Sequence, residues 1–542
     1  MAQVYPFPAY RYNASKVAYD RVLTQPYDKI SPSMQEKYYA ADPHNLIAVE
    51  KGRVLPGDTP PSVPNEKNVY TRAAEALHDW IREQIVVQDT RPCFYSYTQE
   101  YTVPGTADAI GKGERRTRRG FIGAGKLEEY SANVVFRHEH TLSGPKADRL
   151  ELLRHTGMHT GQLFLLYSDA ERLIDTILSE AEAAAPPATE LTDEYGVIHR
   201  LWVVWEPERV EAIRAAMTGQ QLVIADGHHR YETALNFRNE RRKQSAREQG
   251  LPERAEAQDS TATDISPFGT SPAANPSAGN PATANSPSGG HVGGAAASVA
   301  TAAAASLATG VAGPGAAAAG SIAVEPVVDG AGALNAAPYE AAMMTFVNTR
   351  TEGLTILPTH RVVANLPDFS WPVVRRYLEP WFAAEVFSFT DATTKAETRG
   401  SFLHRLIEAR ESRAIGVYPA GEAGKGAFYV LTLRPGANLV ELLPAVSPLQ
   451  RELDVVLLHD GILEPALGIT LQAATAEKNL TYEREASAAL DAVDRGAAQV
   501  AFLLNGCSVD QVWEIATSGE VMPQKSTDFF PKLMSGITMY QV

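Results

Sequence analysis

The amino-acid sequence predicts a mixed α+β protein with more than one domain, and three observations lead to this prediction. Segments with the spacing of amphipathic helices recur along the chain, and apolar or alternating segments typical of strands lie between them. At 542 residues the chain is too long for one compact core. Residues 243–337 differ in composition from both flanks. We therefore expect folded regions on both sides of an insertion.

Residues 1–130 combine helix and strand signals and are predicted to form an N-terminal α/β region. A helix is expected to begin at Ser31-Pro32, because Ser caps a helix and Pro fits its first turn. Residues 70–84 place apolar side chains on one face, which is typical of an amphipathic helix. Strands are predicted at 45–49, at the aromatic-rich residues 93–103 and at 115–127.

Residues 131–242 are predicted to be a core region in which helices and strands alternate. A helix is expected to begin at Pro145, and a hairpin is expected around Tyr195-Gly196. The other predicted elements are a strand at 162–169, helices at 170–185 and 207–217, and a short buried strand from residue 222 that leads into a helix.

Residues 243–337 consist mainly of Ser, Thr, Pro, Asn, Gly and Ala. A segment of this composition cannot bury enough apolar surface to offset its ordering entropy. Helix and strand patterns resume directly after it. It is therefore predicted to be a disordered, low-complexity insertion within a domain, with no catalytic role.

Residues 338–542 are predicted to form a C-terminal α/β region that completes the core. A buried segment at 339–350 precedes a strand at 354–363 that Pro358 interrupts. Helices are then predicted at 373–378, 402–409 and 449–457, and strands at 414–418, 427–433 and 499–504. Near the end, Lys525, Ser526, Thr527 and Lys532 lie in a proline-flanked loop that is a candidate for contacts with anions.

Composition excludes several classes of function. The formal net charge of −15 gives no basic surplus for nucleic-acid binding. Cys93 and Cys507 form neither a disulfide framework nor a zinc motif, and they suit a reducing compartment. The N-terminus lacks the pattern of a signal peptide, and no segment is apolar enough for a membrane span. A cytoplasmic protein with neither nucleic-acid nor membrane partners is expected.

The densest polar motif is DGHHR, which follows the apolar residues 222–225. Asp226, Gly227, His228, His229 and Arg230 lie where a predicted strand gives way to a helix. The free N–H groups and the dipole at a helix N-terminus favour an anion, and an arginine can bind phosphate through two hydrogen bonds. The alternative is a capped helix start with solvated histidines. A phosphate-binding site is the sharper prediction.

A second polar cluster contains His138, Glu139, His140 and Thr141, in the loop before the helix at Pro145. Its HEH spacing differs from the HExxH zinc helix, so a zinc site has little support. The alternatives are a solvated loop and a catalytic carboxylate flanked by imidazoles.

Six motifs in this order resemble the family known as domain of unknown function 1015. The motifs are YPFPAYRYN, QPYDKIS, HEHTLSGPKADRLELL, IADGHHRYETAL, LPTHRVV and MPQKSTDFFPKLMSGI. The core of that family is in turn similar to free-serine kinases and, more distantly, to the ParB/sulfiredoxin-like nucleotide-binding fold. The resemblance implies such a core here, with additional mixed-sheet regions around it.

The serine kinases carry an HE pair and a DGHHR segment, which match His138-Glu139 and residues 226–230. The resemblance implies that Glu139, beside His138, accepts the proton of the acceptor hydroxyl, and that residues 226–230 hold phosphates. It also implies Mg²⁺ bound at Asp226, with ATP or ADP as phosphoryl donor. Further candidates for phosphate or carboxylate contacts are Lys146, Arg149, His360, Arg361 and Lys525.

The leading functional hypothesis is a nucleotide-dependent kinase that phosphorylates free L-serine or a similar small hydroxylated metabolite. The same groups would serve a phosphatase acting on phosphoserine, which is the first alternative. The second is a non-catalytic nucleotide-binding regulatory protein, for which the acidic charge disfavours a DNA partner.

Overall fold

The computed structural model describes residues 1–61, 63, 66–105, 113–139, 144–249, 336–421, 425–470 and 478–542. Met1–Arg254 and Gly330–Val542 belong to one compact unit. Most of the predicted insertion, together with His140 and Thr141, lies outside the described residues. Helix α9 (His228–Glu248) continues past residue 243, so its end lies within the range predicted for the insertion. The charged residues of its last turns are good helix formers, and Gln244 donates to Glu248 one turn later.

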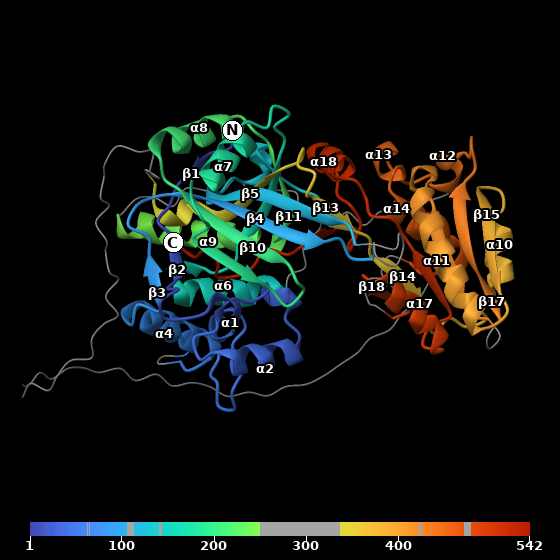
Figure 1. Ribbon diagram of the computed structural model, residues 1–542, viewed down its shortest axis with the longest axis horizontal. Helices are drawn as coiled ribbons and strands as arrows, with labels where there is room; N and C mark the ends of the chain where they lie inside the picture. Colours follow the sequence, from blue (N-terminus) through green and yellow to red (C-terminus); the bar gives the residue numbers. More distant parts are fainter. Residues whose placement is uncertain are drawn as a thin grey trace, which may run out of the picture. The chain divides into compact units, whose positions relative to one another are not determined.

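The first sheet has nine strands and is mixed (Figure 1). β6 pairs with β11, and β8 with β12, in parallel, whereas the other pairs are antiparallel. In sheet order the strands are β6 (Val135–Arg137), β11 (Leu222–Asp226), β8 (Leu163–Tyr167), β12 (Ala341–Asn348), β5 (Arg115–Lys126), β4 (Phe94–Thr102), β10 (Ile198–Val204) and β9 (Thr189–Thr192), and β1 (Val4–Tyr5) also pairs with β5. The predicted mixed α+β class is confirmed.

Helices cover both faces of this sheet, which explains the almost continuously apolar sequences of β8, β11 and β12. On one face, Ile174, Ile213 and Leu235 belong to one core cluster with strand residues. They come from α7 (Leu173–Ala184), α8 (Pro207–Met217) and α9. The opposite face packs against α3 (Ile47–Glu50), α4 (Val69–Arg82) and α6 (Gly144–Thr156).

Local sequence patterns predict most N-terminal helices and strands correctly and one incorrectly. α2 (Pro32–Ala41) begins as predicted, with Ser31 Oγ accepting from the Met34 N–H at 3.2 Å. The strand predicted at 45–49 is wrong, since these residues lead into helix α3, where the Ile47 N–H donates to Asn45 Oδ1 at 2.9 Å. A short apolar run fits a buried helix turn as well as a strand, and only packing distinguishes them.

The second sheet has six strands, antiparallel throughout, drawn in yellow to red in Figure 1. In order they are β15 (Phe382–Phe389), β17 (Gly426–Leu433), β16 (Ile415–Pro419), β19 (Val500–Leu503), β14 (His360–Val363) and β18 (Leu480–Glu483). Residues of α11 (Ala392–Glu408) and α17 (Ala486–Asp494) pack on one face, and those of α10 (Trp371–Leu378) on the other. The helix predicted at 449–457 is instead two short helices, because Leu453 is extended between them.

The predicted break at Pro358 is confirmed. Before it, β13 (Thr355–Leu357) pairs with β20 (Asp528–Phe530), whereas β14 after it joins the second sheet. The remaining described elements are β2 (Tyr10–Tyr12), α1 (Tyr19–Val22), η1 (Tyr27–Lys29), β3 (Val86–Gln88), η2 (Tyr130–Ala132), β7 (Met158–His159), η3 (Pro338–Glu340), η4 (Arg410–Ser412), α12 (Leu439–Leu442), α13 (Pro448–Arg451), α14 (Asp454–Leu458), η5 (His459–Leu463), α15 (Glu464–Leu467), α18 (Val509–Thr517) and β21 (Tyr540–Gln541).

The last twenty residues return to the part of the chain that carries the first sheet. β21 pairs with β7, Met539 bridges to Tyr10, and Ser535 bridges to Thr24. β12 also comes from the predicted C-terminal region, so this region contributes strands to both sheets. The boundaries at 131, 243 and 338 stay a prediction. No helix among the described residues is long and apolar enough to cross a membrane.

Candidate functional site

The two polar motifs meet because the strands that precede them are parallel neighbours. β6 and β11 pair in parallel, with Arg137 opposite Ile224. The residues that follow, His138-Glu139 and Asp226–His228, therefore leave the sheet at the same edge. The carboxyl ends of neighbouring parallel strands are a usual place for ligand sites.

Two hydrogen bonds fix the buried side chain of His138 at this end of the sheet. Its Nδ1 donates to the Ile224 carbonyl at 2.7 Å, and its Nε2 lies 2.9 Å from Thr527 Oγ1. Since a carbonyl only accepts, the neutral ring carries its proton on Nδ1 and Nε2 accepts from the hydroxyl. Burial lowers the pKa of His138 to about 4. We interpret His138 as a positioning residue with both nitrogens engaged.

Glu139 is half-buried beside the C-terminal segment. Its backbone bridges to Met522, and its Oε1 accepts from the Lys525 N–H at 3.3 Å. Burial raises the pKa of Glu139, and the nearby carboxylate of Asp226 raises it further, although the Lys525 N–H and the ammonium of Lys532 act in the opposite direction. A carboxyl group with a raised pKa next to cations is suited to accepting a proton.

Asp226 is ion-paired with a lysine from the end of the chain. Lys532 Nζ lies 3.1 Å from Asp226 Oδ2 and 3.0 Å from Asp528 Oδ1. Burial alone would raise the pKa of Asp226, but Lys532, Arg230 and Lys29 together hold it well below its usual value. Burial would lower the pKa of Lys532, and its carboxylate neighbours outweigh this and raise it. Both groups are therefore charged at neutral pH.

Two further cations surround this pair. Arg484 Nε lies 2.8 Å from Asp528 Oδ2. Lys29 is close enough to Lys532 that the second ammonium adds to burial in lowering the pKa of Lys29. Lys29, Arg484 and Lys532 come from separate parts of the chain, so the positive charge at this place is a product of the fold.

Helix α9 begins at His228, two residues after Asp226. Gly227, its N-cap residue, has φ +94°, a left-handed conformation that favours glycine. His228 is 8% exposed, its ring lies edge-on to His138 at 4.8 Å, and its Nε2 has no hydrogen-bond partner among the described residues. Burial and the neighbouring imidazole lower its pKa well below the usual value. An unpartnered buried nitrogen at a helix N-terminus fits an anionic ligand.

Arg230 folds back over the start of its own helix. One terminal nitrogen donates to the Gln162 carbonyl. A Cβ at Gly227 would lie 3.2 Å from Nε, and a Cβ at Gly161 would lie 3.0 Å from Nη1. The two glycines therefore leave room for the guanidinium, which is fixed next to Asp226 with donors remaining for a ligand.

Lys146 and Arg149, which were also predicted to contact phosphate or carboxylate groups, both pair with other side chains of the protein. Lys146 is ion-paired with Glu232, and its ammonium adds to burial in lowering the pKa of His229. Arg149 is occupied with its own surroundings, since it bonds Asp148 at 2.6 Å and donates to the Glu50 carbonyl at 2.9 Å. Its guanidinium lies 4.4 Å from the ring centre of Tyr27.

His360 and Arg361 do not join the DGHHR motif. Both are buried within strand β14 of the second sheet. His360 Nδ1 accepts from the Leu504 N–H at 3.2 Å. Arg361 reaches the first site only through Lys525, whose carbonyl accepts from Nη2 at 3.2 Å. Their assignment to phosphate or carboxylate contacts stays a prediction, and none of their hydrogen-bond partners is one of residues 226–230.

The carboxylate of Asp226, the predicted Mg²⁺ ligand, is already engaged by a cation of the chain. In the part of the chain that the structure describes, no group of three His, Cys, Asp or Glu side chains is arranged to hold a metal ion. Asp226, the predicted Mg²⁺ ligand, has Lys532 as its partner instead. An ammonium between two carboxylates already balances the charge that a metal would.

Lys29, Arg484 and Asp528 were not singled out from the sequence, whereas Thr527 and Lys532 were predicted only as part of a loop that contacts anions. Lys29 lies in QPYDKIS, and three of the others lie in the KSTDFFPK stretch. For these four residues, the sequence indicated a role only through the motifs in which they lie. No sequence pattern indicated Arg484, because it comes close to Asp528 only through the approach of β18 to the C-terminal segment.

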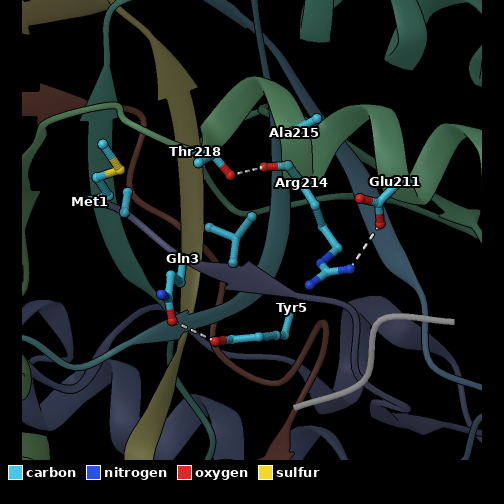
Figure 2. Close-up of a pocket in the computed structure, with 9 residues that line it drawn as sticks. Met1, Gln3, Tyr5, Glu211, Arg214, Ala215 and Thr218 are labelled. Carbon is cyan, nitrogen blue, oxygen red and sulfur yellow. Dashed lines mark hydrogen bonds and ion pairs between the residues drawn. The ribbon is translucent and has the colours of Figure 1, made fainter. Parts of the chain in front are cut away.

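Two cavities are found away from Asp226 and Lys532, and Arg484 lines one of them. Figure 2 shows one of about 290 Å³ between the N-terminal residues and α8. In it, Tyr5 donates to Gln3 at 2.7 Å, and Arg214 is paired with Glu211 at 2.8 Å. None of the predicted site residues lines it. The other, of about 760 Å³, has His360 and Arg361 in its wall.

Comparison with known proteins identifies a family. The family model described as "Protein of unknown function (DUF1015)" matches residues 4–262 and 318–456. No curated protein sequence matches the chain. Among solved structures, a conserved hypothetical protein from Pyrococcus furiosus is 11% identical, with 73% of this chain and 87% of that one covered and a TM-score of 0.25. A free serine kinase in complex with AMP is 11% identical, with 74% and 89% covered and a TM-score of 0.27.

Proposed function

The chain belongs to the DUF1015 family, and we propose that it is a nucleotide-dependent phosphotransferase. The donor is ATP or ADP, and the acceptor is the hydroxyl group of free L-serine or of a similar small metabolite. The observation that carries this proposal is the convergence of Glu139, Asp226 and Lys532 at the ends of two parallel strands.

Phosphoryl transfer requires a carboxylate for the acceptor and positive charge for the phosphates. In the proposed reaction the acceptor oxygen forms a bond to the terminal phosphorus, and the bond from that phosphorus to the bridging oxygen breaks. The hydroxyl proton passes to Glu139. The raised pKa of Glu139 supports this role, because it strengthens the carboxylate as a base.

Lys532, Arg230 and Lys29 would bind the phosphates, since all three act on the same carboxylate, Asp226. The N-terminus of α9 with the unpartnered Nε2 of His228 supports an anion at this place. Asp226 keeps Lys532 charged and oriented. No residue of the chain is assigned to a metal.

The test is direct product detection. The full chain is incubated with L-serine, Mg²⁺ and either ATP or ADP, and phosphoserine is measured by mass spectrometry. Phosphoserine formed with one of the nucleotides supports the proposal. A parallel incubation with phosphoserine alone measures phosphate release, which would identify a phosphatase. If neither product forms, and calorimetry detects no nucleotide binding, the proposal is wrong.

A further inference from the structure

The larger cavity, of about 760 Å³, lies at the second sheet. Arg484, which pairs with Asp528 at the first site, also lines this cavity. Its wall includes residues of β13, β14 and α11 and the first residues of α17. A cavity of this volume accommodates a small molecule. None of Glu139, Asp226, Arg230 and Lys532 lines it. The side chains of its wall decide which kind of ligand it can bind.

Five arginines line this cavity, and four of them have a carboxylate partner. Nitrogen–oxygen distances are 2.7 Å for Arg116–Glu114, 3.2 Å for Arg410–Glu411, 2.6 Å for Arg413–Asp454 and 2.8 Å for Arg484–Asp528. The fifth, Arg361, has no carboxylate within ion-pair distance among the residues that the structure describes. It is also the most buried of the five, at 1% exposed.

The partners of Arg361 are all neutral. Its Nε donates to His459 Nε2 at 3.3 Å, and its two terminal nitrogens donate to the carbonyls of Thr359 and Lys525. The ring centre of Tyr482 lies 5.1 Å away. Burial lowers the pKa of Arg361 to about 10, so the guanidinium remains charged at neutral pH. Two of its five N–H groups, one on each terminal nitrogen, have no acceptor among the described residues.

A buried charge is normally paired, because desolvation without a counter-ion is costly. A guanidinium with one remaining N–H on each terminal nitrogen matches the two oxygens of a carboxylate or phosphate.

We propose that the 760 Å³ cavity binds a small organic anion, with a carboxylate or phosphate group on Arg361 as its counter-ion. This site goes beyond the phosphotransferase proposal and does not depend on it. The first site selects phosphates with several cations around Asp226, whereas this cavity offers one buried guanidinium without a carboxylate partner among the described residues, and four arginines that are paired with carboxylates. It therefore takes a ligand with one strongly held anionic group.

The test is calorimetric titration of the full chain with two probes, inorganic phosphate and succinate, and with neutral succinamide as the control. Ile407→Trp is the blocking variant, because Ile407 is 40% exposed and lines the cavity. Val440→Trp is its matched control, since Val440 is 58% exposed and lies outside the cavity wall. Arg361→Met removes the charge itself.

We expect one or both anions to bind, and succinamide not to bind. Affinity should fall at least about tenfold in Ile407→Trp and Arg361→Met, and not in Val440→Trp. Binding of phosphate alone or succinate alone identifies which anion the site prefers. Phosphate titrations are repeated in Arg230→Ala, so that binding at the first site is separated from binding at this one.

Two outcomes would overturn the inference. One is the absence of binding of either anion to the parent protein, and the other is unchanged affinity in folded Ile407→Trp. If Arg361→Met fails to fold because the Thr359 and Lys525 carbonyls lose their donor, the blocking variant still decides the matter. Failure of the phosphotransferase assay leaves these results unaffected.

Discussion

His229-Arg230 and His360-Arg361 both place an imidazole beside a guanidinium, and the two regions differ in what surrounds the arginine. Arg230, in the first region, follows a strand end and lies beside Asp226 where several charged segments meet. Arg361, in the second, is inside a strand, and the groups it contacts are neutral. A similar sequence signal therefore yields a site of many charges in one sheet and a single buried charge in the other.

The difference follows from where each motif lies along its strand. At the end of a strand the chain leaves the sheet, and other segments can approach the side chains. Within a strand the neighbours are other strands and the helices that cover them, which are mainly apolar. The C-terminal segment connects the two regions, because the Lys525 N–H donates to Glu139 and its carbonyl accepts from Arg361.

The largest expected effect belongs to the first region. Glu139→Gln keeps the size of the side chain but removes the base, so turnover should fall by about 10²- to 10⁴-fold. Nucleotide affinity should barely change, because the phosphate-binding cations remain. Single-turnover rates at saturating nucleotide and serine measure this, with exposed Glu180→Gln on α7 as the control. A Glu139→Gln enzyme within a few-fold of the parent would contradict the assignment.

The pH dependence of that rate has a defined direction. Glu139 must be ionised to accept a proton, so the rate should rise with pH through a pKa raised above its usual value by burial. In Glu139→Gln this rise should disappear from the residual rate. A rise that persists unchanged in the variant assigns it to another group.

The pH dependence of the free energy of unfolding tests whether burial has the same effect on a histidine of each region. Burial lowers the pKa of His138 to about 4 and that of His360 to about 3. Both rings are then neutral when folded but become protonated on unfolding below their ordinary pKa, so the free energy of unfolding falls as pH falls from about 6.5. For His138 the total loss is about 3 kcal/mol.

Denaturant unfolding between pH 7 and pH 4 measures this loss. His138→Asn and His360→Asn should each reduce the proton uptake on unfolding at pH 5 by about one. An effect for one histidine only would show that the site, and not burial, governs the titration.

Nucleotide affinity separates the two arginines. Arg230→Ala should weaken nucleotide binding by about 1.5–3 kcal/mol, the range for a hydrogen bond to a charged group. Folded Arg361→Met should bind nucleotide within about twofold of the parent, because Arg361 is not a phosphate contact at the first site. Calorimetry measures both, with exposed Arg241→Ala on α9 as the control. Equal losses in the two variants would mean that both arginines act on one ligand.

The smallest effect is expected outside both regions. Replacement of residues 250–335 by a short Gly/Ser linker should change the melting temperature by only a few degrees. The composition predicts no buried core there, and loop closure entropy varies slowly with length. Arg242 on α9 is ion-paired with Glu340, so the flanking elements are already held together. Loss of cooperative unfolding, measured by calorimetry, would contradict this prediction.

The sequence by itself determined the elements whose signals are local. The helix at 70–84 follows from its apolar spacing, and helix α2 follows from Ser31 and Pro32. The strand-to-helix junction at Asp226-Gly227 follows from an apolar run that ends at a polar residue and glycine. The same local signals failed at 45–49, where an apolar run was too short to distinguish a helix from a strand.

Only the tertiary structure decided which of the candidate residues act together. The pairing of β6 with β11 brings Glu139 to Asp226, and the return of the chain end brings Lys532 to both. The same packing separates Arg361 from Arg230, although the two motifs look alike in sequence. Sequence spacing fixes contacts only within a helix or a strand, because there the backbone geometry is regular. Contacts between distant segments depend on strand register and on the burial of whole faces, and these are properties of the assembled chain.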